Sequence, residues 1–250
     1  MTSISRVLVP LDSQDAQTFG LALAYAQKIA RTAGVEDVIL LIHTKHQLDH
    51  TSLSRFLGPA VVKGLAKGPV SLQGGGRLHQ ETMKTLRYPP RKSVVLVYYA
   101  EEKILDFVDG LNNVVGVVAV PDISGEADGW AARWTVHTHG HLGQAPAALI
   151  DDPVVVRALE TLTTVINLST GLGHPRDKTM ANEILRILRT KGHGDPSSTI
   201  KSCAIRKGWS PRGASDLEAL ARKIWSLKTK PSLAAFHDPN GRYAHWKAGA

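Results

Sequence analysis

The sequence predicts an α/β fold with a doubly wound, mainly parallel sheet, followed by an all-helical C-terminal module. The main observation is the stretch 92–121, in which two Val-rich runs, 94–99 and 114–120, enclose a segment with apolar residues at helical spacing. Short runs of β-branched and aromatic residues are typical of strands buried on both faces, and a helix between two of them indicates a parallel β-α-β unit. Such a pair needs a larger, Rossmann-like sheet around it.

The first half of the chain supplies the other elements of this sheet. Residues 6–11 are predicted as a first strand, and residues 15–32 as a helix that ends at Gly34. Residues 37–43 follow as a second strand. The remaining elements before the central unit are a helix over 52–66, a short strand over 70–72 and a helix over 78–86. If the strand order is 3-2-1-4-5, the order reverses between the first and fourth strands, and a ligand site is expected there.

The patterns divide the chain into two domains. Residues 1–121 are predicted as the α/β domain, 122–150 as a connecting loop, 151–230 as a basic helical domain and 231–250 as a tail. The helical domain is expected to contain helices over 154–168, 178–191, 197–207 and 215–227. A capping box of Ser215 and Glu218 is predicted to begin the last of them.

Charge divides the chain in the same way. Residues 1–150 contain 14 basic and 13 acidic residues, whereas residues 151–250 contain 16 basic and 9 acidic residues. A basic module favours an anionic partner such as nucleic acid, and a solvated basic surface is the alternative. No apolar run reaches the length of a membrane span, and Cys203 is the only cysteine. We therefore expect a cytoplasmic protein without a membrane partner.

Polar and aromatic residues follow the first, second and fourth predicted strands. Ligands of open α/β sheets bind beyond the carboxyl ends of the strands, where the strand order reverses. The candidate ligand-binding residues are Asp12, Ser13, His43, Tyr98, Tyr99 and Glu101. Asp12 would accept hydrogen bonds from a ribose or base, or hold a metal, and the tyrosine rings would stack on a base. The alternative is that Asp12 caps the first helix and the tyrosines pack in the core.

The segment 7–30, VLVPLDSQDAQTFGLALAYAQKIA, resembles the opening of universal stress proteins. The shared features are a strand, a Val-Pro-x-Asp turn and a long helix with an Ala-rich pattern. The resemblance implies a Rossmann-like domain in which the turn aspartate, here Asp12, lies against an adenine nucleotide. The later Gly-x-x-Gly, nine residues, Gly-Ser/Thr motif of that family is absent after the fourth predicted strand. The resemblance is therefore mostly one of architecture, which does not fix function. A nucleotide cofactor or a small phosphorylated ligand is the expectation that it carries for the strand ends.

Histidines form two clusters that are candidates for metal binding. The first cluster alternates along the chain, so that in an extended segment its side chains point to one side; it consists of His137, His139 and His141. The second consists of His43, His46 and His50. No cysteine accompanies either cluster, and polar loop histidines are the alternative.

The helices between residues 178 and 227 have the spacing of a helix-turn-helix-like fold, which places one helix in the major groove of DNA. The candidate phosphate contacts are Arg186, Arg189, Lys191, Lys201, Arg206, Lys207 and Arg212. A protein-docking domain or a structural cap is the alternative. Trp209 is expected to anchor a turn in the core, and Cys203 to serve packing.

Three functional hypotheses follow. The first is a binding or regulatory protein, with a small-ligand α/β domain joined to a basic helical module that contacts nucleic acid. The second is an enzyme that acts on a nucleotide or phosphorylated small molecule at the strand ends. The third is an interaction or structural protein without a ligand. No P-loop or Gly-x-Ser-x-Gly elbow is present, so no catalytic residue is assigned.

Overall fold

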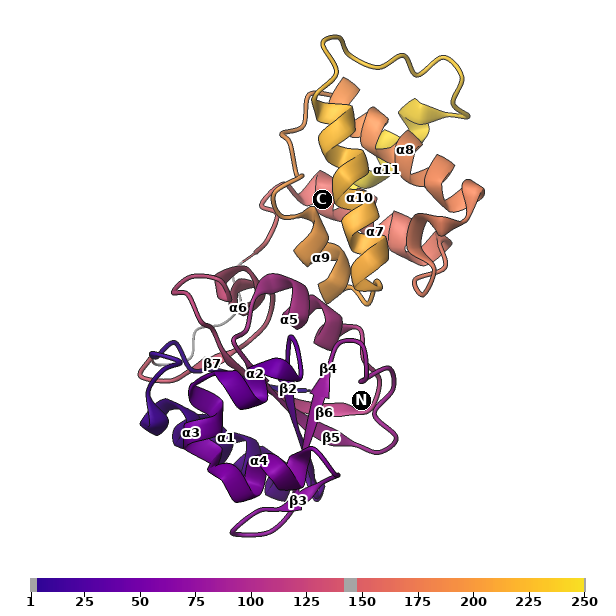
Figure 1. Ribbon diagram of the computed structural model, residues 1–250. Coiled ribbons are helices and arrows are strands. Elements are labelled where there is room, and N and C mark those ends of the chain that lie inside the picture. Colours follow the sequence, from indigo (N-terminus) through magenta and orange to yellow (C-terminus); the bar gives the residue numbers. More distant parts are fainter. Residues whose placement is uncertain (1–3, 142–147, 250) are drawn as a thin grey trace. The chain divides into compact units, whose positions relative to one another are not determined.

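The computed structural model describes residues 4–141 and 148–249 (Figure 1). The chain forms two compact units, residues 1–146 and 147–250. The first is an α/β unit and the second is helical in its described part. No helix among the described residues has both the length and the apolar character needed to cross a bilayer.

Seven strands form one sheet in the described part of the first unit, in the order β3-β4-β2-β5-β6-β1-β7. Every neighbouring pair is parallel except β3 with β4. The strands are β1 (Ser5–Leu8), β2 (Asp37–Ile42), β3 (Val70–Ser71), β4 (Arg77–Thr82), β5 (Ser93–Tyr98), β6 (Val114–Val120) and β7 (His137–Thr138). The two Val-rich runs are β5 and β6, which pair directly, with Leu96 opposite Val118. The mainly parallel sheet is thus confirmed.

Helices cover both faces of this sheet. One face packs against α1 (Ala16–Ala33), α2 (His46–His50), α3 (Ser52–Leu57) and α4 (Pro59–Leu65). The other face packs against α5 (Glu102–Asp109) and α6 (Asp128–Arg133). Every residue of β2 and β5 is buried, with alternate side chains facing opposite layers. This burial explains why both strands are nearly continuous apolar runs in the sequence.

One assumption and one prediction about this sheet are not met. The order 3-2-1-4-5 is not found, because β1 lies between β6 and β7, and β5 is flanked by β2 and β6. Residues 78–86, predicted as a helix, begin with most of β4, which pairs with β2 along its whole length. Only Leu78 and Thr82 of β4 are buried. The polar sequence therefore shows no apolar run, and pairing with β2 decides the conformation.

The segment 122–150, predicted as a loop, contains α6 and β7 in its described part. A buried carboxylate, Asp109 at the end of α5, holds α6 in place. It accepts hydrogen bonds from Arg133 (2.9 Å) and from the indole N–H groups of Trp134 (2.9 Å) and Trp130 (3.4 Å). Hydrogen bonds to one buried carboxylate thus hold α6, which lacks the apolar stripe by which a helix is recognised in a sequence.

The same carboxylate reaches the first strand. Arg6 of β1 lies 3.5 Å from Asp109, and its guanidinium stacks 3.7 Å from the ring centre of Trp134. Burial lowers the pKa of Arg6, and the charge of Asp109 acts against that shift. Arg133 also donates to Asp106 at 2.8 Å. The side chains of Arg133 and Asp109 are both fully buried, so their charges depend on each other.

We expect Asp109→Asn to destabilise the α/β unit by about 3 kcal/mol, because it leaves a buried guanidinium undercompensated. Asp106 still pairs with Arg133, which keeps the cost at the low end of the range for broken buried pairs. Hydrogen exchange of α5 and α6 peptides across a urea series measures this change. Asp128→Asn, at an exposed carboxylate of α6, is the matched control and should shift stability by less than about 0.5 kcal/mol. Equal unfolding midpoints for both variants would contradict the assignment.

The second unit contains a repeated start signal for its helices. Its elements are α7 (Pro153–Val165), the short 3₁₀ turn η1 (Gly171–Gly173), α8 (Pro175–Thr190), α9 (Ile200–Arg206), α10 (Pro211–Trp225) and α11 (Pro239–Ala248). Four of these helices begin with a proline, preceded by a residue whose side chain accepts a backbone N–H; these residues are Asp152, His174, Ser210 and Asp238. Proline fits the first position because its missing N–H would have no helical partner there.

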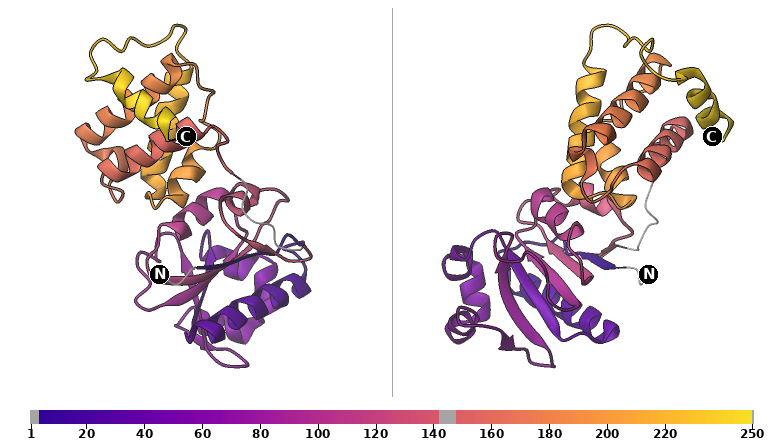
Figure 2. Two further views of the ribbon diagram at one scale, coloured as in Figure 1. Left: turned by 180° about the vertical axis from the view of Figure 1, so that it is seen from behind. Right: turned by 90° about the vertical axis from the view of Figure 1, so that its right-hand side faces the viewer.

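One expectation for this unit needs correction. The last predicted helix starts at Pro211, capped by Ser210, and not at the capping box of Ser215 and Glu218. The tail 231–250 contains α11, which lies beside α7 (Figure 2). Trp246 of α11 is buried and donates to the Thr161 hydroxyl at 3.1 Å. The buried Trp246 side chain thus packs α11 against the other helices of the unit.

Further contacts close the helical unit. Asp152 caps α7 and also accepts a hydrogen bond from His193 Nδ1 at 2.6 Å, while His193 Nε2 lies 3.2 Å from the Tyr243 hydroxyl. Burial acts to raise the pKa of Asp152, but its bonds to His193 and to backbone N–H groups outweigh it and lower that pKa.

Two residues that were expected in the core of this unit lie there. Trp209 is buried and donates a hydrogen bond to Thr163. Cys203 is buried too, and its burial raises the pKa of the thiol.

Candidate functional site

The crossover connections change from one face of the sheet to the other at two borders, which are separated by the β5–β6 pair. The connections after β1 and β2 run over the face of α1–α4, whereas those after β5 and β6 run over the face of α5 and α6. Because β2 neighbours β5 and β6 neighbours β1, the chain leaves to opposite faces at both borders. Ligands of open α/β sheets bind at such borders, at the carboxyl ends of the strands. The predicted single border between the first and fourth strands is thus replaced by two.

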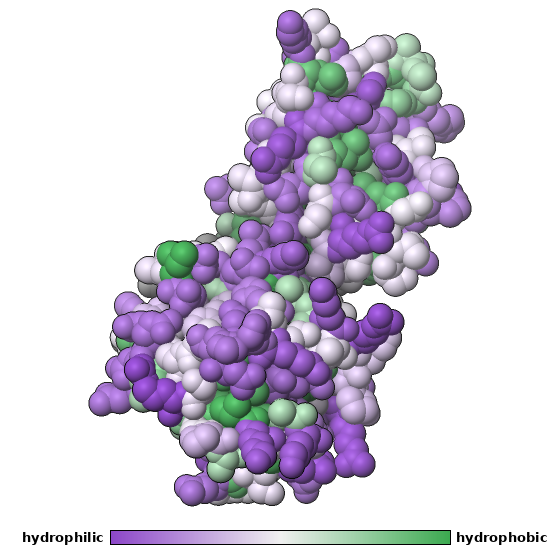
Figure 3. All heavy atoms as spheres, viewed as in Figure 1, coloured by the Kyte–Doolittle hydropathy of each residue, from purple (hydrophilic) through white to green (hydrophobic). Residues whose placement is uncertain are grey.

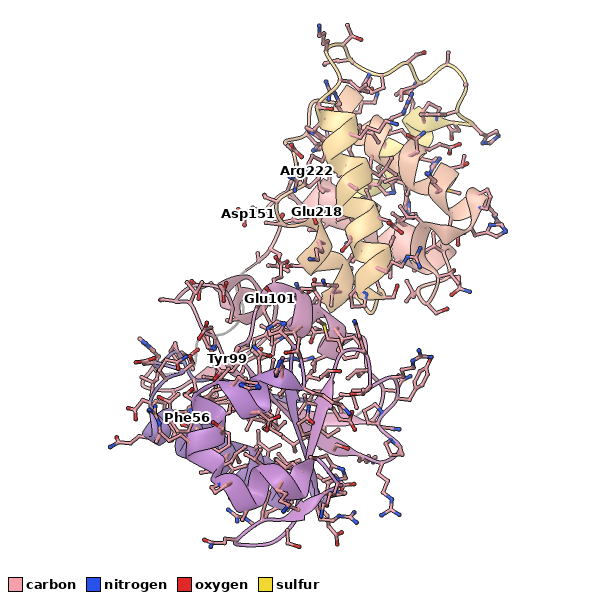
Figure 4. The ribbon with its side chains drawn as sticks, in the orientation of Figure 1. Phe56, Tyr99, Glu101, Asp151, Glu218 and Arg222 are labelled. Carbon is pink, nitrogen blue, oxygen red and sulfur yellow. The ribbon has the colours of Figure 1, made fainter. Side chains whose placement is uncertain are left out.

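His43 joins the strand ends at the border of β2 and β5. Its Nε2 lies 2.8 Å from the carbonyl oxygen of Tyr99, and its Nδ1 lies 3.6 Å from the Glu101 carboxylate. Figure 4 labels these two partners, Tyr99 and Glu101, on the α/β unit. A neutral imidazole has one N–H, so the bond to the carbonyl leaves Nδ1 as an acceptor. A protonated ring would satisfy both partners. The His43 side chain is one-quarter exposed, so it is accessible to a ligand.

Tyr99 has an unusual backbone conformation at the same border. Its φ of 61° is left-handed, a region that aromatic residues seldom adopt. The other described non-glycine residues with positive φ are Asn113 and Asp238, for which it is common. The Tyr99 ring is buried, and its hydroxyl lies 3.0 Å from Ser52 Oγ. Strained backbone of this kind is concentrated at functional sites.

Ser13 joins the strand ends at the border of β6 and β1. Its hydroxyl donates to Asp122 at 2.5 Å, and its carbonyl accepts from the Tyr98 hydroxyl at 2.8 Å. Asp12 is exposed and accepts from the backbone N–H of Gln14 at 2.8 Å. The residue that caps α1 is Asp15, so Asp12 does not have that role. Tyr98 and Tyr99 are both buried, and neither ring has an open face on which a base could stack.

This edge of the sheet is acidic. Burial raises the pKa of Tyr98, and the neighbouring Tyr99 and the carboxylates of Asp12, Asp15 and Asp122 raise it further. Glu101 and Glu102 stand at the start of α5. Carboxylates thus occupy the starts of both α1 and α5, where a phosphate would otherwise find a favourable dipole. An unscreened phosphate is disfavoured among these negative charges.

Sequence reasoning missed two residues of this site. Asp122 follows β6 directly after Pro121, so the rule that located the other candidates at strand ends would also have found it. Ser52 begins α3, and its hydroxyl bridges Tyr99 and the carbonyl of Ser13, the latter at 3.5 Å. No local pattern marks it, since its role depends on how α3 packs.

The alternating histidines are brought together only in part. His137 Nε2 and His139 Nδ1 lie 3.4 Å and 3.0 Å from the hydroxyl of Tyr25. Among the described residues, no side-chain hydrogen bond joins His141 to them. In the second cluster, the rings of His46 and His50 meet edge to face, with centres 4.1 Å apart. Within the ranges that the structure describes, no three His, Cys, Asp or Glu side chains are placed to hold a metal ion.

The predicted phosphate contacts come from α8, α9, α10 and the turns that follow α8 and α9, and several have partners inside the unit. Arg189 donates to the carbonyl oxygens of Ile224 and Leu227 at the end of α10. Lys207 pairs with Glu160 at 2.9 Å, and Lys191 donates to Asn240 at 2.8 Å. These three residues contribute to the packing of the helices.

The remaining candidates differ in exposure. Arg212 is exposed at the start of α10, and Arg186, half-buried in α8, donates from Nε to Asn182 at 3.1 Å. Lys201 and Arg206 of α9 are half-buried and have interactions of their own. Arg212 is therefore the candidate most open to an external partner.

Comparison with known proteins assigns a family description to the helical part. Residues 151–247 match the family model described as Domain of unknown function (DUF1889). The match extends from α7 into α11 and covers less than half of the chain. No curated protein and no solved structure matches the chain. The resemblance of residues 7–30 to universal stress proteins has no support from these comparisons.

We expect Tyr98→Phe to lower the stability of the α/β unit by about 1 kcal/mol, because it removes a buried hydrogen bond to the turn after β1. Tyr88→Phe is the matched control, since Tyr88 is 79% exposed. Urea denaturation followed by hydrogen exchange of β1 and α1 peptides measures both. Faster exchange around Ser13 in Tyr98→Phe alone is the expected result, and unchanged exchange there would contradict the proposed contact.

Proposed function

We propose that the α/β unit is a binding domain for a small polar ligand at the carboxyl edge of its sheet. The observation that carries the proposal is that four parallel strands end at one edge, where the residues that follow them include His43, Glu101, Ser13 and Asp122. Fold rules place ligands of such sheets at this edge. The left-handed Tyr99, whose carbonyl accepts from His43, supports the same location.

The charge of this edge determines the class of ligand. The exposed carboxylates of Asp12 and Asp122 are hydrogen-bond acceptors for hydroxyl and amino groups. A nucleoside, with its ribose hydroxyls and amino group, suits them better than a free phosphate does. A phosphorylated ligand would need a divalent cation to offset the carboxylates. We therefore narrow the expected nucleotide ligand to its nucleoside part.

Adenosine is the probe that tests this proposal. We expect it to bind more tightly than metal-free ATP in titration calorimetry, and Mg²⁺ to strengthen the binding of ATP. Asp12→Asn with His43→Ala should weaken adenosine binding about tenfold, equal to roughly 1.4 kcal/mol. Asp49→Asn, at an exposed carboxylate of α2, is the control.

Two results would contradict the proposal. One is tighter binding of metal-free ATP than of adenosine, and the other is unchanged binding in the Asp12 and His43 variant. Proton NMR can monitor whether adenosine is chemically converted during the titration. If it is, the site is catalytic. His43 would then be the first residue to consider as a general base, because Nδ1 is free to accept a proton when Nε2 donates.

A second candidate function, contact with nucleic acid, applies to the helical unit. Between residues 176 and 230 the chain contains 13 basic and 5 acidic residues. Arg176 and Lys178 of α8 and Arg212 and Lys223 of α10 are exposed. Surface cations of this density favour a polyanion through counterion release.

Binding of a fluorescent DNA duplex at increasing salt tests this second function. We expect affinity to fall steeply with salt, and Arg212→Glu to reduce the slope of log affinity against log salt by about 1. Lys28→Glu, an exposed residue of α1, is the control with the same charge change. Salt-independent binding, or equal slopes for both variants, would rule out phosphate contacts by Arg212.

A further inference from the structure

We propose that the groove between α8 and α10 binds an anionic amphiphile, a molecule with an apolar body and one terminal carboxylate or phosphate. The groove has a volume of about 380 Å³, which lies within the range of small-molecule sites. Its apolar residues include Leu220, Ile224 and Leu227, and its ionisable residues are Lys178, Arg186 and Lys223. This site is separate from the carboxyl edge of the sheet and does not depend on the function proposed for it.

The apolar part of the groove follows from helix spacing. Leu220, Ile224 and Leu227 recur at i, i+4 and i+7, so they form one stripe along α10 and the turn after it. Ile224 is buried, but Leu227 is 37% exposed and is among the few large apolar side chains left open to solvent. Figure 3 shows apolar residues between hydrophilic ones over α8 and α10. An apolar ligand body would remove this surface from water.

The charged part of the groove has one sign. Lys178 and Arg186 come from α8 and Lys223 from α10, and none of the described residues that line the groove is acidic. Lys178 and Lys223 are exposed, and neither ammonium has an ion pair within the described residues. Arg186 is bonded through Nε to Asn182, which holds its guanidinium in place and leaves the terminal nitrogens for an anion. The groove therefore combines an apolar stripe with three cationic side chains, of which Arg186 is held by a hydrogen bond and the two lysines are exposed.

The apolar stripe and the cations of the groove together indicate the class of ligand. A nucleic acid would use the cations but would leave the apolar stripe in water, and a neutral apolar molecule would leave the cations unused. A single-headed anionic amphiphile satisfies both. Decanoate and decyl phosphate represent the two head groups, and decanol is the neutral control of equal length.

Titration calorimetry with the full chain, below the micelle concentration of each probe, tests the proposal. We expect decanoate or decyl phosphate to bind at least about tenfold more tightly than decanol. Hexanoate should bind more weakly than decanoate, because each buried methylene contributes up to about fourfold in affinity. Methyl NMR should show shifts at Leu220 and Leu227. A preference between the two anionic probes would assign the head group.

Two variants and one control make the test specific. Lys178→Glu with Lys223→Glu should reduce decanoate affinity at least about tenfold, while Lys230→Glu with Lys247→Glu, which makes the same charge change at exposed lysines outside the groove, should not. Leu227→Gln should weaken decanoate without changing the charge. The proposal is overturned if decanol binds as tightly as decanoate, if both double variants lose affinity equally, or if neither anionic probe binds.

Discussion

The common direction of four buried strands is the constraint on which the α/β unit depends. β2, β5, β6 and β1 pair in parallel, so each must be followed by a crossover over one face of the sheet. All four carboxyl ends then lie at one edge, and the choice of face after each strand determines where the chain diverges. The candidate site is a product of this geometry, because its residues come from four separate turns and meet only there.

The two units differ in the charge that they offer to a ligand. The edge of the sheet gathers aspartates and glutamates at strand ends and helix starts, where they also stabilise the helices through the dipole. The helical unit has a surplus of lysine and arginine, of which some, such as Arg189, hold helices together and others remain exposed. A basic composition therefore does not identify contact residues by itself, since only the structure separates internal from external partners.

The parts of the fold that sequence predicts well are those set by local patterns. The Val-rich β5 and β6 and the helix between them have the predicted type and nearly the predicted bounds, because burial on both faces imposes a continuous apolar run. β4 was missed because its sequence, RLHQET, is polar and its conformation depends on pairing with β2. α6 was missed because Asp109, distant in sequence, holds it. At the site, strand-end positions were predictable, whereas the strand order and Ser52 depend on long-range packing.

The Asp152 carboxylate links the first and last helices of the helical unit. One carboxylate caps the first helix of the unit, binds His193 just after α8, and through that ring is linked to Tyr243 in the last helix. The beginning of the unit is thereby tied to its end, and the family match starts at the residue just before Asp152. A single carboxylate thus serves at once as a helix cap and as the clasp between the first and last helices of the unit.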